Sequence, residues 1–308
     1  MTESRKREPA ARPVGECLEA LAEPVGRRCF RTGLEALDER IEGLHGGELT
    51  ALVGRPKAGL TAFAIGLAVS SAVLGRRRTA LVSLGISEAR LTRRLLAYTA
   101  RLPVDSLRTG RLTHQEHRMV QDADELLAGS KLVVLADPSR DARSLDARLE
   151  ELARAEGGPS LLIVDGLGRC LEDPGLELRQ GSAFTALRRL ADRGEHATLL
   201  TWTLEPPDRS FSCSNIALED VPALLHQAET LLALDRDPVR FSRAADARLR
   251  VLASPHGPAG SIPLSFSPSI ARFDAVEDKA RWPGLDVRTR DRLEGLARRF
   301  DAPHSFDA

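Results

Sequence analysis

Short apolar runs alternate with helical patterns along most of this chain, and that alternation limits the possible folds more than any other feature. The runs read as buried strands, and between them apolar residues recur every three or four positions, as on a helix. Such an order predicts an α/β fold with a mainly parallel sheet and helices on both faces. The predicted strands are 49–53, 79–84, 131–136, 160–164, 197–203 and 230–234, and the predicted helices are 60–74, 88–100, 143–155 and 182–193.

The sequence also predicts a C-terminal hairpin and the division of the chain into one domain with flanking segments. The segments 249–253 and 261–266 flank "SPHGPAG" and predict a β-hairpin near the end of the domain. We expect a disordered tail over 1–13, a linker-type helix and connector over 14–30, one domain over 31–278, and a charged helix and tail over 279–308.

Composition excludes several classes of protein. Lys and Arg number 44 and so do Asp and Glu, so the chain is not a strongly basic nucleic-acid binder, and any DNA contact must come from a local patch. The four cysteines form no CxxC pair, which argues against a zinc site or a disulfide framework and favours a cytoplasmic location. The N-terminus lacks the apolar core of a secretory signal, and we expect no membrane segment.

The stretch "GRPKAGLT" follows the first predicted strand of the sheet and precedes a helix, which is the setting of a phosphate-binding loop. Glycines let the backbone N–H groups and the helix N-terminus point at phosphates, and a hydroxyl after the loop can ligate Mg²⁺. The lysine of that motif is replaced by Leu60, so a glycine-containing turn without a ligand is the alternative interpretation. The expected nucleotide-binding residues are Gly54, Arg55, Pro56, Lys57, Ala58, Gly59, Leu60 and Thr61.

A second motif supports the nucleotide interpretation. "SLLIVD", residues 160–165, is an apolar strand that ends in Asp165, the form of a Walker B segment. Together the two motifs predict a P-loop NTPase architecture, with Thr61 and Asp165 as the Mg²⁺ positions if nucleotide binds.

At this point the chain resembles the C-terminal RecA-like motor domain of DnaB-type replicative helicases, of helicase superfamily 4. The resemblance is carried by "RTGLEALDERIEGLHGGELTALVGRP" at 31–56, "SLGIS" at 83–87, "RLPVDSLRTGRL" at 101–112, "HQAETLLALDR" at 226–236 and "HGPAGSIPLSFSPSIARFD" at 256–274. It implies a RecA-like fold, ATP with Mg²⁺, single-stranded DNA, and assembly either with itself or with a hexameric helicase. The helical domain that precedes the motor in full-length relatives is not expected here.

The chain departs from that family at the positions that carry its chemistry. By the resemblance, the P-loop lysine falls on Leu60, the water-polarising glutamate on Gly85 and the γ-phosphate-sensing glutamine on Thr203. The lysine and the arginine finger that the family gives to a neighbouring subunit fall on Ala253 and Pro255. The resemblance therefore implies a degenerate Walker A motif, impaired hydrolysis and weakened affinity for ATP. Lys57 could replace the lost charge, but we expect it on the exposed shoulder of the loop.

The resemblance also implies DNA-binding loops that follow two of the strands. The matching segments, 168–181 and 205–220, carry Arg169, Arg179 and Arg209 together with several acidic residues, so they supply no clear positive lining. In the hairpin, His256 could contact phosphate or a neighbouring subunit, but we expect it to be a solvent-exposed turn residue. Two functions follow: a non-catalytic structural or regulatory partner in DNA metabolism, or an active ATP-dependent helicase. A signalling scaffold that needs no ATP is a third possibility.

Overall fold

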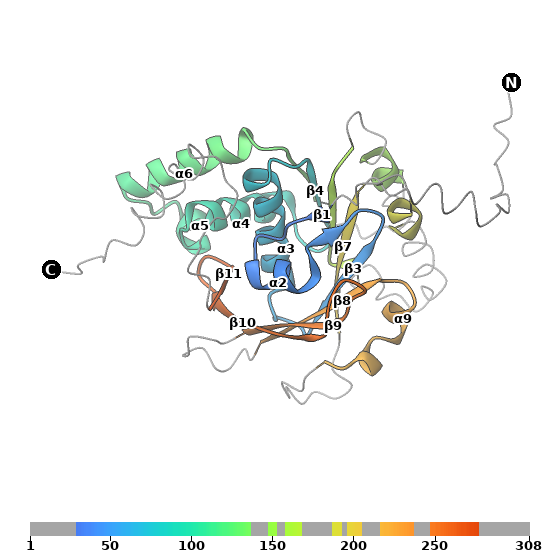
Figure 1. Cartoon of the computed structure of the whole chain (residues 1–308). Coiled ribbons are helices and arrows are strands. Elements are labelled where there is room, and N and C mark those ends of the chain that lie inside the picture. Colours follow the sequence, from blue (N-terminus) through green and yellow to red (C-terminus); the bar gives the residue numbers. More distant parts are fainter. Residues whose placement is uncertain are drawn as a thin grey trace, which may run out of the picture.

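The computed structural model describes residues 29–136, 147–152, 158–167, 187–192, 196–204, 216–236 and 247–276 (Figure 1). The predicted tail 1–13, nearly all of the connector 14–30 and the predicted helix and tail 279–308 lie outside these residues. So do Arg169, Arg179 and Arg209, the proposed DNA-binding arginines.

A large, mainly parallel sheet forms the centre of the molecule, as the alternating pattern predicts. In the described residues it has nine strands, in the order β11-β10-β9-β8-β3-β7-β6-β4-β5. The six strands from β8 to β5 are parallel. Their bounds are β3 Leu49–Gly54, β4 Thr79–Ser83, β5 Leu132–Ala136, β6 Leu161–Asp165, β7 Ala197–Thr203 and β8 Thr230–Arg236.

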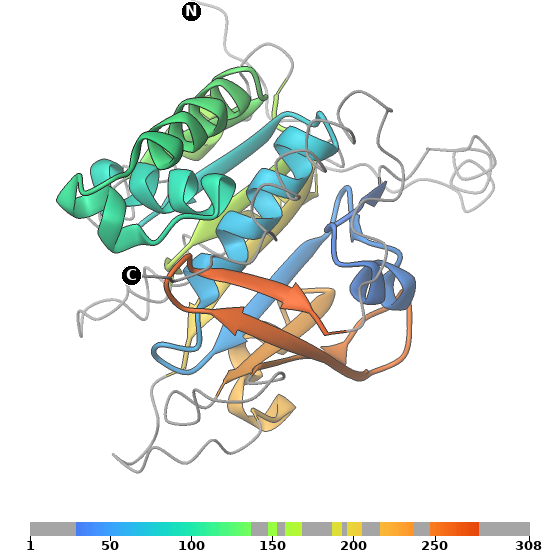
Figure 2. The ribbon, with the colours of Figure 1, turned by 90° about the vertical axis from the view of Figure 1, so that its left-hand side faces the viewer.

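Antiparallel strands extend the sheet beyond β8. The predicted hairpin is confirmed as β9 (Ala247–Ala253) and β10 (Gly260–Ser267), and β11 (Arg272–Ala275) pairs with β10 at the edge. In Figure 2 these strands are orange and red, and the turn between β10 and β11 reaches the helical side of the molecule, where the Val104 N–H donates to the Ser269 carbonyl at 2.9 Å and Arg272 lies over the Tyr98 ring. A separate ladder joins β1 (Cys29–Phe30) to β2 (Leu44–His45).

Helices lie against the sheet at its parallel end. α3 (Leu60–Val69) continues as a π-helical turn over Ser70–Leu74, and α4 (Glu88–Ala100) has the bounds that its pattern predicts. Among the described residues, the remaining α-helices are α2 (Glu35–Ile41), α5 (Val104–Thr109), α6 (His114–Ala128) and the short α9 (Pro222–Leu225), besides the helical segments near 149 and 190. None of the helices in the part of the chain described here has the length and apolar character needed to cross a bilayer.

The sheet separates two apolar clusters, because successive side chains on a strand point to opposite faces. On β3, Leu52 joins the cluster under α3, whereas Ala51 and Val53 join the cluster that includes Leu187 and Leu190 from a helical segment at 187–191. The prediction that helices cover both faces is therefore confirmed. This double burial fixes the parallel strands and so fixes the edge at which their carboxyl ends meet.

Candidate functional site

The loop between β3 and α3 has the shape of a phosphate cradle. Gly59 caps α3 with a left-handed backbone, φ 106°, and a Cβ atom there would lie 2.7 Å from Cζ of Phe273. Glycine is therefore required at this position on two counts, since the conformation disfavours a side chain and the space is filled. Lys57 also has positive φ, 68°, and its side chain is exposed, as the sequence predicts for the shoulder of the loop. The N-terminal end of α3 is left facing a pocket.

This pocket has a volume of about 370 Å³ and lies at the carboxyl edge of the parallel strands. That edge is where α/β sheets bind ligands. Residues 55–57, 59–61, 85, 165 and 203 all come from the sequence prediction and all line it. The pocket also includes Arg94, Arg236, Thr201 and Phe266, which the sequence argument did not select.

Asp165, at the end of β6, is held by three hydroxyl groups. Its Oδ1 atom accepts hydrogen bonds from Thr201 Oγ1 at 2.8 Å and Thr61 Oγ1 at 3.2 Å, and its Oδ2 atom accepts from Ser83 Oγ at 3.3 Å. The residue is only 3% exposed. Thr61 and Asp165, the two predicted Mg²⁺ positions, are thus brought together, and an oxygen pair of this kind suits a hard divalent cation.

Thr201 connects this carboxylate to the backbone of the next residue. Its Oγ1 atom accepts from the Gly166 N–H at 2.8 Å while it donates to Asp165. Gly166 itself lines the pocket. A single threonine on β7 therefore positions both the carboxylate and the turn that follows it.

Leu60, at the position of the P-loop lysine, belongs to the apolar core. It is 7% exposed, and its Cδ2 atom lies 2.9 Å from where a Cβ on Gly54 would stand. The side chain is packed back along the loop toward β3. It brings no charge to a phosphate, so the cradle keeps its backbone donors without its central cation.

Cations nevertheless surround the pocket. Arg55, Lys57, Arg94 and Arg236 line it, and Arg236 Nη1 donates to the Lys57 carbonyl at 3.2 Å. The Arg236 guanidinium lies 4.2 Å from the ring centre of Phe266, a cation–π contact that orients it. A signal for Arg236 was present in the sequence, because it follows an apolar strand at the edge where ligands bind.

Acidic groups are sparse by comparison. Among the described residues that line the pocket, Asp165 supplies the one carboxylate, and Gly85 and Thr203 line it without one. A general base that activates water must lie within hydrogen-bond reach of it. The described lining has no second carboxylate for that role.

The hairpin residues singled out from the sequence lie elsewhere. Ala253 pairs with Leu231 near the start of β8, whereas Gly54, at the loop, pairs with Leu234 toward its end. Neither Ala253 nor Pro255 is among the described residues that line the pocket. The expectation that His256 is solvent-exposed is wrong: its side chain is 10% exposed and bonds to Glu48, because the turn folds back onto the domain.

Comparison with known proteins places these features in context. Residues 29–187 match the family model described as the DnaB-like helicase C terminal domain. The "Probable plasmid replicative DNA helicase" of Chlamydia trachomatis is 25% identical over 254 residues, which cover 80% of this chain and 55% of that protein. The "Replicative DNA helicase DnaB" of Treponema pallidum is 26% identical over 245 residues, or 79% of this chain and 55% of that protein. The chain therefore spans about half the length of the curated relatives it matches.

Solved structures agree on the fold. One that is described as an "ATPase Domain" matches with a TM-score of 0.74 at 16% identity, over 87% of this chain and 100% of that one. A structure titled "The Structure Of A DnaB-Like Replicative Helicase And Its Interactions With Primase" matches with a TM-score of 0.69 at 16% identity, over 86% of this chain and 67% of that one. The RecA-like fold predicted from the sequence is confirmed.

Proposed function

Because the chain belongs to the family of DnaB-like helicase C-terminal domains, we propose that it is a catalytically degenerate motor domain. It acts in DNA replication or another part of DNA metabolism as a structural or regulatory partner, and not as an ATP-driven motor. In this sense it is a pseudoenzyme built on an ATPase fold.

One observation carries the proposal: the described pocket lining has a single carboxylate, and three hydroxyls already engage it. ATP hydrolysis needs a group that orients or deprotonates the attacking water, and such a group is typically worth about 10²–10⁴ in rate. With Gly85 and Thr203 at the positions where the resemblance expects glutamate and glutamine, this contribution is lost. The absence of an arginine finger at the hairpin would remove roughly 10³–10⁵ more.

The residues that remain fit a nucleotide phosphate with Mg²⁺ better than they fit its hydrolysis. Backbone N–H groups of the loop and the N-terminal end of α3 would receive the phosphates, and Thr61 and Asp165 would hold the metal. Mg²⁺ would neutralise part of the phosphate charge. The buried Leu60 leaves the phosphates short of one cation, so we expect weak nucleotide binding.

The partner is proposed from the family and from the fold. A domain of this kind would associate with copies of itself or join a hexameric helicase, and single-stranded DNA is a further candidate ligand. One solved relative is titled as a helicase that interacts with primase, which makes replication proteins the first class of partner to test. A cytoplasmic location belongs to the same proposal.

A second function, an active ATP-dependent helicase, is favoured by the cations at the pocket. Arg55, Lys57, Arg94 and Arg236 all line it and could compensate for the missing lysine. The two functions differ in what DNA does to ATP turnover.

Steady-state ATP hydrolysis and unwinding of a forked duplex, each with and without single-stranded DNA, separate the two functions. We expect neither activity to exceed that of Asp165→Asn. DNA-stimulated turnover that Asp165→Asn abolishes would establish the active helicase instead. Sedimentation of the same samples, with and without a replicative helicase, would show whether the chain assembles without turnover.

A further inference from the structure

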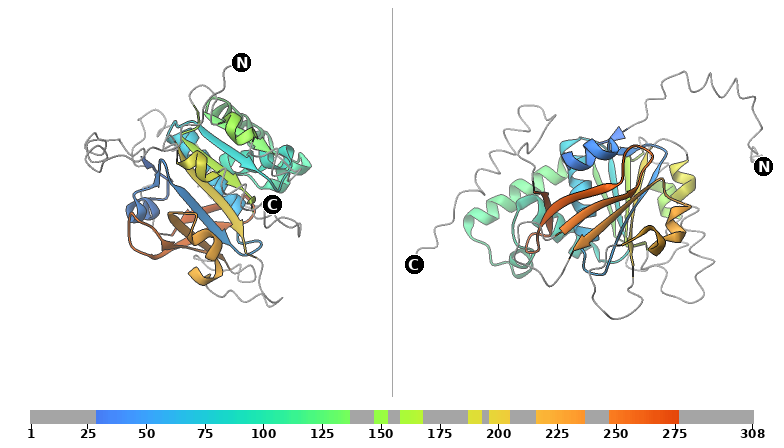
Figure 3. Two further views of the ribbon diagram at one scale, coloured as in Figure 1. Left: turned by 90° about the vertical axis from the view of Figure 1, so that its right-hand side faces the viewer. Right: turned by 60° about the horizontal axis from the view of Figure 1, so that its bottom comes forward.

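The loop that joins β9 to β10 is fastened to its own domain. A Cβ atom on Gly257 would overlap the carbonyl oxygen of Arg40, so only glycine allows the two backbones to approach this closely. Arg40 Nη1 also lies 3.5 Å from the carbonyl oxygen of Ala259. Figure 3 shows α2, in blue, beside this loop.

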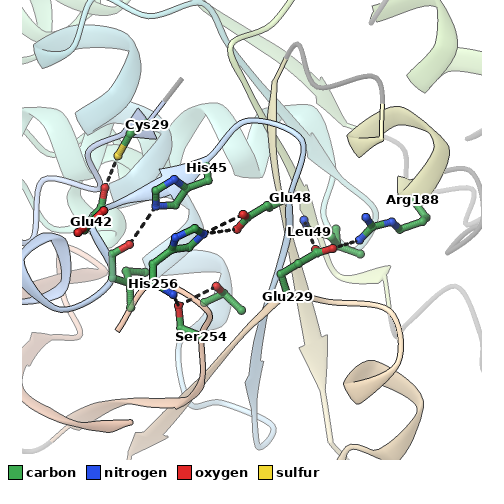
Figure 4. Close-up of polar contacts among 11 residues, drawn as sticks. Cys29, Glu42, His45, Glu48, Leu49, Arg188, Glu229, Ser254 and His256 are labelled. Carbon is green, nitrogen blue, oxygen red and sulfur yellow. Dashed lines mark hydrogen bonds and ion pairs between the residues drawn. The ribbon is translucent and has the colours of Figure 1, made fainter. Parts of the chain in front are cut away.

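Two histidines hold the loop against β2. The rings of His45 and His256 are stacked, with centroids 3.6 Å apart and planes at 17°. His256 Nε2 lies 2.8 Å from each carboxylate oxygen of Glu48, as Figure 4 shows. The three residues are well shielded: His45 is 6% exposed, and the side chains of His256 and Glu48 are 10% and 18% exposed.

The hydrogen bonds fix where protons can lie. His45 Nε2 is 3.2 Å from the carbonyl oxygen of Ile41, which can only accept, so this nitrogen carries hydrogen. Its Nδ1 atom is buried and has no hydrogen-bond partner among the described residues. A proton added at Nδ1 would therefore create an imidazolium with no acceptor for the new N–H group.

The cluster can balance one positive charge but not two. Among the described carboxylates, Glu48 is the one that bonds to either ring. It can neutralise a protonated His256 while His45 stays neutral beneath it. A second proton would place two like charges on rings 3.6 Å apart.

Charged groups on the neighbouring elements do not relieve the repulsion between two protonated histidines. Arg40, on α2, adds a positive charge at the same loop. Glu229, next to β8, is held by Arg188 and by the Leu49 N–H. Other titratable groups on the flanking elements include Cys29 on β1, whose thiol donates to the Glu42 carbonyl, Glu42 itself, and His196, whose backbone carbonyl accepts from Gly47. The flanking elements also carry Glu35, Asp38 and Glu39 on α2, where Asp38 is bonded to Thr32 and Gly33, and Arg248 and Arg250 on β9, where Arg250 pairs with Asp235.

We propose that His45, His256 and Glu48 form an acid-sensitive latch, which holds the β9–β10 loop closed with one proton and releases it when a second proton binds. The latch lies among strand ends opposite the phosphate cradle, so it does not depend on whether nucleotide binds or is hydrolysed. Three contacts join the segment 40–48 to the loop: the stack of His45 on His256, the ion pair of Glu48 with His256, and the close approach of Gly257 to the Arg40 carbonyl.

Amide hydrogen exchange at His256, Gly257, Ala259 and Gly260 in the full chain, expressed as protection relative to the intrinsic rate at each pH, tests the latch. Between about pH 8 and pH 5.5, the range in which histidines titrate, we expect protection to fall roughly tenfold or more. In His45→Phe, which keeps a stacked ring, and in His45→Gln, which keeps an N–H donor, the second proton has no site. In each of these two variants that folds, protection should then change by less than about threefold over the same pH range.

Two further variants make the result specific. Glu48→Gln removes the charge that balances the first proton, so loss of protection should begin at higher pH. His117→Gln, at an exposed histidine on α6, should behave as the wild type does. Equal loss in the wild type and in both His45 variants would overturn the proposal, and would point to His196 or to general acid destabilisation. Unchanged protection in the wild type would overturn it as well.

Discussion

At the scale of single residues, Thr201 makes two hydrogen bonds through one hydroxyl group at the pocket. Its hydroxyl donates to the Asp165 carboxylate, which is only 3% exposed, and accepts from the Gly166 N–H, so it satisfies two polar groups at once. Thr201→Val keeps the shape of the side chain and removes both bonds. Because hydrogen bonds to charged groups contribute about 1.5–3 kcal/mol, we expect the free energy of unfolding to fall by roughly that amount in urea denaturation.

Thr203→Val, two residues further along β7, is the matched control. Its side chain is half-buried at the edge of the pocket, and surface-type substitutions usually change stability by less than about 0.5 kcal/mol. Equal destabilisation by the two changes would show that the Asp165 hydroxyl network is not what matters at this edge.

At the scale of elements, α2 is tied to the segment before it by Asp38. The carboxylate accepts from the Thr32 N–H at 2.7 Å, the Thr32 hydroxyl at 2.9 Å and the Gly33 N–H at 3.2 Å. These bonds give a structural reason for the "TG" and "LD" parts of the opening motif. Burial nevertheless raises the pKa of Asp38, outweighing the bonds that lower it.

The raised pKa has a definite sign in a stability measurement. The folded protein binds this proton more tightly than the unfolded chain does, so the contribution is present at low pH and is lost as pH rises through the folded pKa. Asp38→Asn should therefore remove a downward slope of unfolding free energy with pH above about pH 4. Urea denaturation of both proteins at several pH values between about 4 and 7 measures that difference, and parallel curves would contradict it.

The loop and α3 form the second element with a testable property. Leu60→Lys restores a cation at the first position of α3, and we expect affinity for a labelled ATP analogue with Mg²⁺ to rise about tenfold or more, since charge-assisted bonds to phosphate are strong. The same change should lower stability, because the site lies in the core. Leu60→Met, which conserves volume without charge, is the control. If both variants bind the analogue equally, the missing lysine does not limit affinity.

The elements also show how far sequence patterns reach. The parallel strands and α4 were predicted closely because each is a long apolar or amphipathic segment with clear ends. The two-residue strands of the β1–β2 ladder and the edge strand β11 were missed, since so few residues carry no periodicity. The helix α6 was missed although its capping box, Thr113 with Glu116, is visible in the sequence.

At the scale of the whole molecule, the site residues fall into two groups: those that a local motif predicts and those that only the folded sheet brings together. Local motifs single out residues 54–61 and Asp165, and the structure places 55–57, 59–61 and Asp165 around the pocket, whereas Gly54 and Ala58 are not among its described lining. Their roles in binding nucleotide stay a prediction. No local motif marks Arg94, Thr201 and Arg236, which line the pocket from α4, β7 and β8, or Ser83, which bonds to Asp165. Thr201 and Arg236 could be placed there only from the common edge at which parallel strands end. The exposure of His256 was misjudged for a related reason: its turn carries exposed residues, but the His256 side chain is shielded by Glu48, a residue far away along the chain.

For the molecule as a whole, we propose that a motor fold has kept its phosphate cradle and lost the groups that drive hydrolysis. Release of labelled phosphate from γ-labelled ATP in a single-turnover reaction, with protein in excess over nucleotide and with Mg²⁺ and single-stranded DNA present, tests this most directly. The account predicts no release above that of Asp165→Asn. Rapid release by the wild type, abolished by that substitution, would contradict it.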